Sequence, residues 1–179
     1  METKIEFKHK ILIENCKSGN AKSQFELYDL YADAMFNIAI RFLKSKEDAE
    51  DVVQESFIKA FKSLHTFSFE SSFGAWLKRI VINNCINFLK LKKISFTEIK
   101  QQEYFDNEEE IPVLNELNIQ KIKKGILLLS NGYSQIISLY LIEGYDHNEI
   151  SEILKISVST SKSQYHRAKK KLIEIINTL

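Results

Sequence analysis

The sequence is poor in the features that mark membrane, secreted and metal-binding proteins. No apolar run approaches the roughly 20 residues that cross a bilayer, and the first residues, Met-Glu-Thr-Lys-Ile-Glu, lack the apolar segment of a signal peptide. The two cysteines, Cys16 and Cys85, lie far apart without a Cys-x-x-Cys pair, which argues against a zinc or redox site and fits a reducing compartment. These absences predict a cytoplasmic protein that does not insert into a membrane.

The total charge of the chain does not suggest a nucleic-acid partner, but the charges are segregated. Lys and Arg number 25 against 24 Asp and Glu, a formal net charge of +1. Residues 101–120 are acidic, hold no Lys or Arg and contain the only proline, Pro112. A chain of 179 residues with 44% apolar content can bury one good core or two small ones. We therefore expect two domains, at 1–92 and 119–179, joined by a flexible acidic linker at 93–118 that is too polar to fold alone.

The end of the chain has the pattern of a helix-turn-helix. Asp146 and Glu149 are placed as a capping box for a short helix that ends near Lys155 and has one apolar face, formed by Ile150, Ile153 and Leu154. Ser157 can cap the next helix, in which an inward stripe repeats at four, three and four residues, at Ser161, Tyr165, Ala168 and Leu172. A helix, a short break and a second, basic helix indicate binding to duplex DNA.

The outer face of the second helix carries side chains that suit DNA. Residues 155–172 contain no acid, whereas an ordinary surface helix intersperses acids among its bases. Short hydroxyls and cations can contact base edges and hold phosphates. The candidate residues for duplex DNA are Ser159, Thr160, Lys162, Ser163, His166, Arg167 and Lys170. The alternative is a basic, solvated helix in a helical bundle.

The first half of the chain has helical periodicity throughout and carries an acidic stripe. Ser45 and Asp48 are placed as a capping box for a helix whose exposed face holds Asp51, Gln54, Glu55 and Ile58, at spacings of three, one and three residues. The helix dipole accounts for acids in the first turn, such as Glu47, but not for this stripe. An exposed acidic and apolar stripe is typical of a site for a basic partner helix.

Residues 65–73, His-Thr-Phe-Ser-Phe-Glu-Ser-Ser-Phe, break the helical pattern with aromatic side chains among small polar ones. An exposed ring gives an unstacked base a face to lie on, and a hydroxyl such as that of Ser68 can bond to the edge of the base. The alternative is that Phe67, Phe69 and Phe73 fill the joint between two helices, and for Phe73 we prefer this alternative. The helix that follows has one packed face and one face of amides and cations, formed by Lys78, Arg79, Asn83, Asn87 and Lys90.

No pattern in the sequence indicates catalysis or a cofactor. A Gly-rich phosphate loop, a metal-spaced cluster and a nucleophile with an adjacent His are all missing. The histidines are scattered and fit ordinary surface or capping positions; they are His9, His65, His147 and His166. An enzyme is therefore the least favoured class. A conventional helix-turn-helix regulator would explain the end of the chain, but it gives the acidic stripe and the aromatic segment no role.

Two blocks of the sequence resemble a known family. Asp48 to Phe61, Asp-Ala-Glu-Asp-Val-Val-Gln-Glu-Ser-Phe-Ile-Lys-Ala-Phe, and Phe73-Gly-Ala-Trp-Leu-Lys-Arg-Ile resemble region 2 of the extracytoplasmic-function sigma factors of bacterial RNA polymerase. Residues 143–172 resemble region 4 of the same family. The resemblance runs from about Cys16 to Leu172, without the linker. The chain departs from the family pattern at Lys155, where a Gly is common in the turn, and at Gln164, where an Arg is usual.

The resemblance implies an all-α fold of two small helical domains, the second a helix-turn-helix, and a role in promoter opening. It implies that Asp51, Gln54, Glu55 and Ile58 bind the clamp of core polymerase, and that region 4 binds the flap and reads the minus-thirty-five element. It assigns the minus-ten element, with a flipped base captured near Phe67, to Phe67, Ser68, Lys78, Arg79, Asn83 and Asn87. Expected partners are core polymerase, promoter DNA and an anti-sigma factor, either soluble or membrane-bound, with no cofactor.

Overall fold

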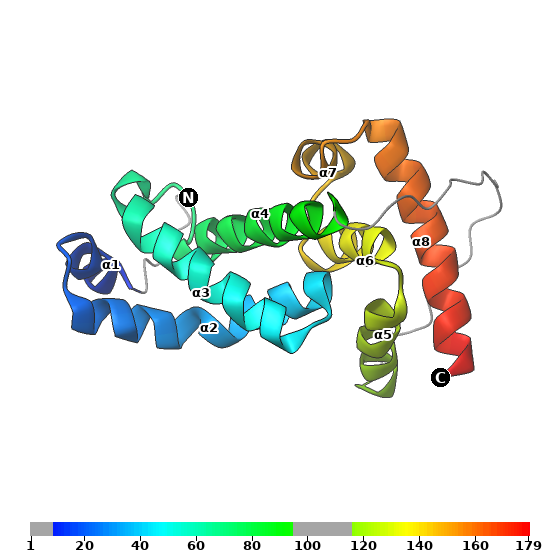
Figure 1. Cartoon of the computed structure of the whole chain (residues 1–179), viewed down its shortest axis with the longest axis horizontal. Coiled ribbons are helices and arrows are strands. Elements are labelled where there is room, and N and C mark those ends of the chain that lie inside the picture. Colours follow the sequence, from blue (N-terminus) through cyan, green and yellow to red (C-terminus); the bar gives the residue numbers. More distant parts are fainter. Residues whose placement is uncertain (1–8, 95–115) are drawn as a thin grey trace, which may run out of the picture. The chain divides into compact units, whose positions relative to one another are not determined.

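The structure is a computed structural model that describes residues 9–94 and 116–179, and every regular element in these ranges is a helix. The all-α class expected from the sequence is confirmed. The chain divides into two compact units, Met1–Lys90 (unit 1) and Leu91–Leu179 (unit 2), drawn in Figure 1 from blue to green and from yellow-green to red. Most of the expected linker, residues 93–118, lies outside the described residues, so the domain limits expected from the sequence stay a prediction.

The helices of unit 1 begin at polar caps that satisfy their first amides. The Oδ1 of Asn20 accepts a hydrogen bond from the amide of Ser23 at 3.0 Å, and Ser45 Oγ accepts one from the amide of Asp48 at 3.2 Å. Lys44 separates the two long helices in a left-handed conformation, with φ of 61°. The elements of the unit are α1 (Lys10–Lys17), α2 (Ala21–Leu43), α3 (Lys46–Ser63), the 3-10 helix η1 (Leu64–Thr66) and most of α4 (Phe73–Ile94).

The core of unit 1 lies between α2, α3 and α4. Leu27 and Phe42 from α2, Phe57 from α3, and Leu77 and Ile82 from α4 are fully buried. Each such side chain contributes about 1.5–3 kcal/mol when it leaves water. The inward face expected on α3 is confirmed, since its buried residues include Ala49, Val52, Val53, Phe57 and Ala60. The opposite face of α3 is thereby left for solvent or a partner.

Unit 2 is built from shorter helices around a smaller, mainly aliphatic core. Its elements are α5 (Glu116–Leu128), α6 (Asn131–Ile137), the π-helical turn η2 (Ser138–Ile142), α7 (His147–Leu154) and α8 (Val158–Thr178). The fully buried side chains include Ile126, Ile136, Ile137, Leu139 and Ile150. Gly125 lets α5 approach α8 closely, because a Cβ there would lie 2.9 Å from Leu172 Cδ1.

Two properties of the described residues concern membrane spanning and the cysteines. In the described ranges, none is both long and apolar enough to cross a bilayer. Cys16 and Cys85 are buried free thiols. Burial raises the pKa of both thiols, that of Cys85 to about 12, so neither carries an appreciable thiolate fraction near neutral pH.

Candidate nucleic-acid and protein interfaces

The acidic stripe of α3 lies on one exposed face of the helix. Its members are Asp51, Gln54, Glu55 and Ile58, all exposed, whereas Val52 and Val53 between them are buried. The side chain of Ile58 is 55% exposed, so a partner that covers it would remove apolar area from water. The structure therefore groups these side chains as the spacing indicated, and their role in binding polymerase stays a prediction.

A hollow of about 300 Å³ adjoins the stripe, and sequence reasoning missed it. Gln54 of the stripe lines the hollow together with Val53, while α2 contributes the rings of Tyr28 and Phe36. The residues from α2 could not be found from spacing on α3 alone, because they meet the stripe only through the packing of α2 against α3. A partner that covers the stripe can therefore also place a side chain between the two helices.

A buried polar network ties the stripe to α4. Glu55 and Lys59 form an ion pair at 2.8 Å, and Lys59 Nζ donates to Asn84 Oδ1 at 3.0 Å. Asn84 in turn donates from Nδ2 to Ser56 Oγ at 2.8 Å, and Ser56 Oγ donates to the carbonyl of Val52 at 2.6 Å. Asn84 lies on the packed face of its helix and is 8% exposed. Its buried amide is satisfied, which links α3 and α4 with a fixed geometry.

Residues 65–73, here called the aromatic loop, pack their first phenylalanine inward. Phe67 is 3% exposed, with ring centroids of Phe69 at 4.8 Å, Trp76 at 5.4 Å and Phe73 at 5.8 Å. The alternative of a ring that fills the joint between helices is thus the observed arrangement for Phe67 as well as for Phe73, because several rings bury more apolar area together than apart. Ser68 beside it is exposed. Base capture by Phe67 stays a prediction, and it requires that the cluster open to uncover the ring.

The polar face of α4 is a single exposed row. Arg79, Asn83, Asn87 and Lys90 are exposed at spacings of four, four and three residues, which place them along one side of a helix. Lys78 is half-buried and lies about 100° around the helix from Arg79, so it does not belong to the row. Amides and cations in a row can follow a single strand, the amides at base edges and the cations at phosphates.

The helix-turn-helix expected near the end of the chain is confirmed. Asp146 accepts from the amide of Glu149 at 2.8 Å, and Glu149 accepts from the amide of Asp146 at 2.8 Å, which completes the capping box. Ser157 Oγ caps α8 by accepting from the amide of Thr160 at 3.0 Å. Lys155 ends α7 in the left-handed region, with φ of 56° and ψ of 51°. This conformation explains why a glycine is common at the position.

The outward face of α8 is polar and carries no acid through its first three turns. Ser159, Lys162, Ser163 and Lys170 are exposed, while Thr160, His166 and Arg167 are half-buried. The hydroxyl of Ser157 lies 2.9 Å from that of Ser159 and 2.8 Å from that of Thr160, so the helix begins in a cluster of hydroxyls. The hydroxyls of Ser159 and Thr160 keep a lone pair for a DNA group, whereas that of Ser157 is fully used by its three contacts. The predicted contacts thus share one end and side of α8, and their role stays a prediction.

A polar joint between η2, α7 and α8 was not found from the sequence. His147 Nδ1 lies 2.9 Å from Ser161 Oγ, and its ring stacks on Tyr140 with centroids 4.6 Å apart and also contacts Tyr165. His147 is thus an internal contact of the helix-turn-helix rather than an ordinary surface side chain. Partial burial lowers the pKa of His147, the nearby Lys162 lowers it further, and Asp146 opposes this change.

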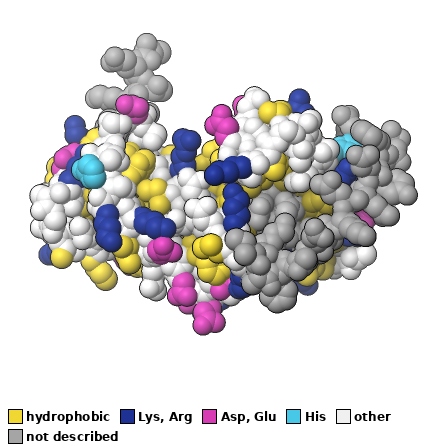
Figure 2. Space-filling model, turned by 45° about the horizontal axis from the view of Figure 1, so that its top comes forward, with side chains coloured by type: hydrophobic (Ala, Val, Ile, Leu, Met, Phe, Trp, Pro, Cys, Tyr) yellow, Lys and Arg dark blue, Asp and Glu magenta, His cyan; other side chains and the backbone are white. Residues whose placement is uncertain are grey.

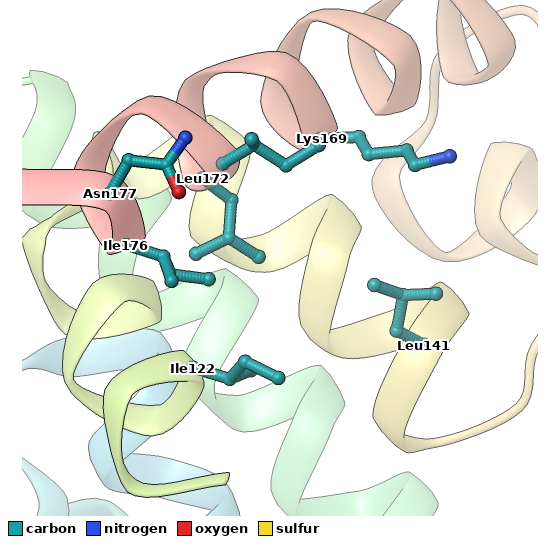
Figure 3. Close-up of a pocket in the computed structure, with 7 residues that line it drawn as sticks. Ile122, Leu141, Lys169, Leu172, Ile176 and Asn177 are labelled. Carbon is teal, nitrogen blue, oxygen red and sulfur yellow. The ribbon is translucent and has the colours of Figure 1, made fainter. Parts of the chain in front are cut away.

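Unit 2 also has a small apolar groove away from the hydroxyl cluster. It has a volume of about 50 Å³ and lies between α5, η2 and α8. Figure 3 shows Ile122, Leu141 and Ile176 around this groove, with the ammonium group of Lys169 extending away from Ile122. Leu127, 41% exposed, and Leu128, 58% exposed, are further exposed apolar side chains of α5. Elsewhere, Figure 2 shows apolar side chains interspersed with charged ones on the face in view.

Comparisons with known proteins match both units in the same order. Residues 27–93 match the family Sigma-70 region 2, and residues 119–172 match Sigma-70, region 4. The chain is 31% identical to the ECF RNA polymerase sigma factor SigW of Bacillus subtilis, with 89% of this chain and 92% of that protein covered. It is 30% identical to the ECF RNA polymerase sigma-E factor of Salmonella typhimurium, with 89% of each protein covered.

The fold also matches a solved sigma factor structure. The co-crystal structure of the sigma factor RpoE in complex with the anti-sigma factor NepR from Bartonella quintana aligns with a TM-score of 0.57 and 22% identity. The alignment covers 88% of this chain and 98% of that one. The helical arrangement described above is therefore one that a sigma factor adopts.

Proposed function

The chain belongs to the extracytoplasmic-function family of RNA polymerase sigma factors. From this premise we propose which of its surfaces binds polymerase and which bind promoter DNA during transcription initiation. Like other members, it directs core RNA polymerase to specific promoters and opens the minus-ten element. The observation that carries the assignment of surfaces is the separation of an acidic stripe on unit 1 from a recognition helix on unit 2 that holds no acid over residues 158–172, in units that match regions 2 and 4.

The acidic stripe of α3 binds the clamp of core polymerase. Support comes from the exposed carboxylates of Asp51 and Glu55 and the exposed apolar side chain of Ile58, which together suit a basic amphipathic helix. Gln54 adds an amide at the edge of the hollow between α2 and α3. The cationic partner steers the encounter, and burial of Ile58 adds apolar area.

The aromatic loop and the polar row of α4 act on the minus-ten element. Phe67 stacks on an extruded base, Ser68 bonds to its edge, and Arg79, Asn83 and Asn87 follow the displaced strand. Capture of an extruded base stabilises the open strand without ATP, and it must offset a few kcal/mol of unstacking. Lys78 lies off the row and contributes by its charge.

The outer face of α8 reads the minus-thirty-five element as duplex. Arg167, Lys162 and Lys170 neutralise phosphates, while the hydroxyls at the start of the helix approach base edges. His166 lies on the same side and can donate or accept a hydrogen bond there. The polar joint around His147 holds α7 and α8 at the angle that presents this face.

The apolar groove of unit 2 serves protein partners. Ile122, Leu141 and Ile176 offer a shallow apolar surface to the flap of core polymerase. RpoE of Bartonella quintana is held in its solved complex by the anti-sigma factor NepR, and we infer an anti-sigma factor as a second partner of this chain. A competitor that covers the groove would exclude the flap.

We infer that the protein works as a polymerase subunit rather than as a catalyst, in the cytoplasm where core polymerase acts. Core polymerase catalyses RNA synthesis, and this chain contributes binding free energy that stabilises the opened DNA. We retain 1–92, 93–118 and 119–179 as the proposed limits of region 2, the linker and region 4.

Transcription from a genomic library tests the whole assignment. Core polymerase plus this protein should give transcripts with defined starts, and the sequences upstream of those starts should share two elements. The Asp51→Lys variant should give none of these starts. Tight, sequence-specific binding of promoter DNA by the pure protein without polymerase would instead favour a helix-turn-helix regulator.

Strand opening is tested at Asn83, which is exposed and outside the core. Asn83→Ala should leave occupancy of the promoter by polymerase unchanged in filter binding but lower the permanganate reactivity of unpaired thymines. Lys62→Ala, at an exposed position of α3, is the matched surface control. Normal permanganate reactivity in Asn83→Ala would remove this residue from the minus-ten surface.

A further inference from the structure

Helix α1 contacts the aromatic loop, although α1 lies outside the segment that matches region 2. Lys17, the last residue of α1, donates from Nζ to the backbone carbonyl of Phe67 at 3.0 Å. The same ammonium group lies 4.6 Å from the ring centroid of Phe69, and Lys10 Nζ lies 5.7 Å from it. Glu14 holds Lys17 in place with an ion pair at 3.2 Å. Both cations are on α1, whereas the region 2 match begins at residue 27.

The backbone of Phe69 is strained in this arrangement. Its φ is 61°, in the left-handed region that a bulky side chain rarely adopts. The ring of Phe69 covers that of Phe67, with centroids 4.8 Å apart. Attraction between the lysine cations and the face of the Phe69 ring offsets the strain. The loop therefore has a closed conformation that α1 stabilises and that the backbone of Phe69 opposes.

The closed conformation leaves no room for a base against Phe67. Its side chain is 3% exposed, with the rings of Phe73 and Trp76 on its other sides. An extruded base can reach this ring only after Phe69 moves away. The contact that resists this movement most directly is the one that Lys17 makes to the carbonyl of Phe67 and to the ring of Phe69.

We propose that Lys17 is a positioning residue for strand opening, which holds the aromatic loop closed over Phe67 in the free protein and releases it when promoter DNA is bound. A phosphate offers the ammonium group a charge-assisted bond in place of the carbonyl and the ring, and the partly exposed ion pair with Glu14 opposes this exchange only weakly. Release then lets Phe69 leave its strained conformation and uncovers Phe67. This inference rests on the proposed capture of a base by Phe67.

The closed loop can be measured in the free protein, without DNA. The amide of Phe67 donates to the carbonyl of Leu64 at 3.1 Å, so its hydrogen exchange reports loop opening. Trp76 is the only tryptophan, and it contacts Phe67, so quenching of its fluorescence by acrylamide reports the same event. Lys17→Met should raise the exchange rate of the Phe67 amide by about tenfold, because a charged hydrogen bond and a cation–π contact are lost.

Two variants control this measurement. Lys17→Arg keeps a cation and a donor, so exchange at Phe67 should stay within about twofold of the native protein. Lys22→Met removes the same charge from an exposed position of α2 and should change neither exchange nor quenching. Circular dichroism of each variant shows whether α1 and its neighbours remain folded. Native exchange at Phe67 in Lys17→Met would overturn the proposal.

The second measurement adds core polymerase and a promoter. If Lys17 restrains the loop, Lys17→Met should give permanganate-reactive thymines faster than the native protein, and Lys17→Arg should not. Slower opening in Lys17→Met would mean that Lys17 shapes the loop for capture rather than restrains it, and would also overturn the proposal. Native opening by Phe67→Leu, which cannot stack on a base, would instead remove the base-capture role and leave the free-protein result standing.

Discussion

The two units differ in the burial of a central predicted DNA contact, which is buried in unit 1 and exposed in unit 2. In unit 1 the ring proposed to capture a base, Phe67, is part of the hydrophobic core, and the loop around it is held by α1. In unit 2 the side chains proposed to read DNA, such as Lys162 and Lys170, lie outside the core on a helix that capping hydrogen bonds and a polar joint hold in place. Stability and the proposed contact with DNA are therefore coupled at Phe67 and separable at Lys162 and Lys170.

The largest expected effect is a loss of folding stability when the core of unit 1 is disrupted. Phe67→Ala should lower the free energy of unfolding by about 3–5 kcal/mol, because it opens a cavity among packed rings. Denaturant unfolding followed by Trp76 fluorescence measures this change. Asn83→Ala, at an exposed position, should shift stability by no more than about 0.5 kcal/mol. Equal midpoints for the two variants would contradict the burial of Phe67.

The next effect concerns the protein partner of unit 1. Asp51→Lys should weaken binding to core polymerase by about 2–5 kcal/mol, because a like charge then faces the cationic partner. Titration of labelled protein with core polymerase gives the affinity. Asp51 is a cleaner site than Glu55, whose reversal would also repel Lys59 within the same helix.

The control for this prediction is Asp29→Lys, the same reversal at an exposed position of α2. It should leave the affinity for core polymerase close to native. An Asp51→Lys protein that binds as tightly as the Asp29→Lys protein would remove the stripe from the polymerase interface.

A smaller effect is expected at the recognition helix. Arg167→Ala should weaken the initial polymerase–promoter complex by about 1–3 kcal/mol and reduce the salt dependence of binding by about one phosphate contact. Filter binding over a series of salt concentrations measures both. Lys171→Ala is the matched control, since Lys171 is half exposed and paired with Glu174 at 2.8 Å. Full occupancy of Arg167→Ala at elevated salt would exclude Arg167 from the interface.

The smallest effect is a pH dependence of unit 2. The pKa of His147 is lowered below its ordinary value of 6.5 in the folded protein, so the unfolded chain binds its proton more readily. The neutral side chain of His147 therefore adds to the free energy of unfolding above pH 6.5. This contribution is lost as the pH falls through the lower pKa of the folded state. Thermal unfolding between about pH 8 and pH 5 should show this loss in the native protein. His147→Gln should show a shallower dependence, and equal slopes would contradict the role of the joint.

Helix starts were predictable because each depends on a few neighbouring residues. Ser45, Asp146 and Ser157 cap the helices that their sequences indicated, and the inward positions of α3 follow from helical spacing. The stripe on α3 was predictable for the same reason. Local pattern thus accounts for the helices and for which faces of α3 and α8 are free.

Contacts between helices were not predictable from local pattern. The burial of Phe67 depends on Trp76 and Phe73 across the loop, and spacing cannot tell an exposed ring from one that other helices cover. The pairing of His147 with Ser161 depends on the angle between α7 and α8. The π-helical turn η2 also gave no signal, since its residues, Ser-Leu-Tyr-Leu-Ile, fit an ordinary helix.

The burial of both cysteines makes the native chain suitable for site-specific labelling. Cys16 and Cys85 are buried in unit 1 with raised pKa values, and residues 91–179 contain no cysteine. A maleimide added to the folded protein therefore meets no reactive native thiolate. A single cysteine introduced at an exposed position of α8 outside the predicted DNA contacts, such as Lys171, becomes the one point of attachment for a fluorophore or photocrosslinker. The distance from the recognition helix to promoter DNA can then be followed without removing any native residue of the core.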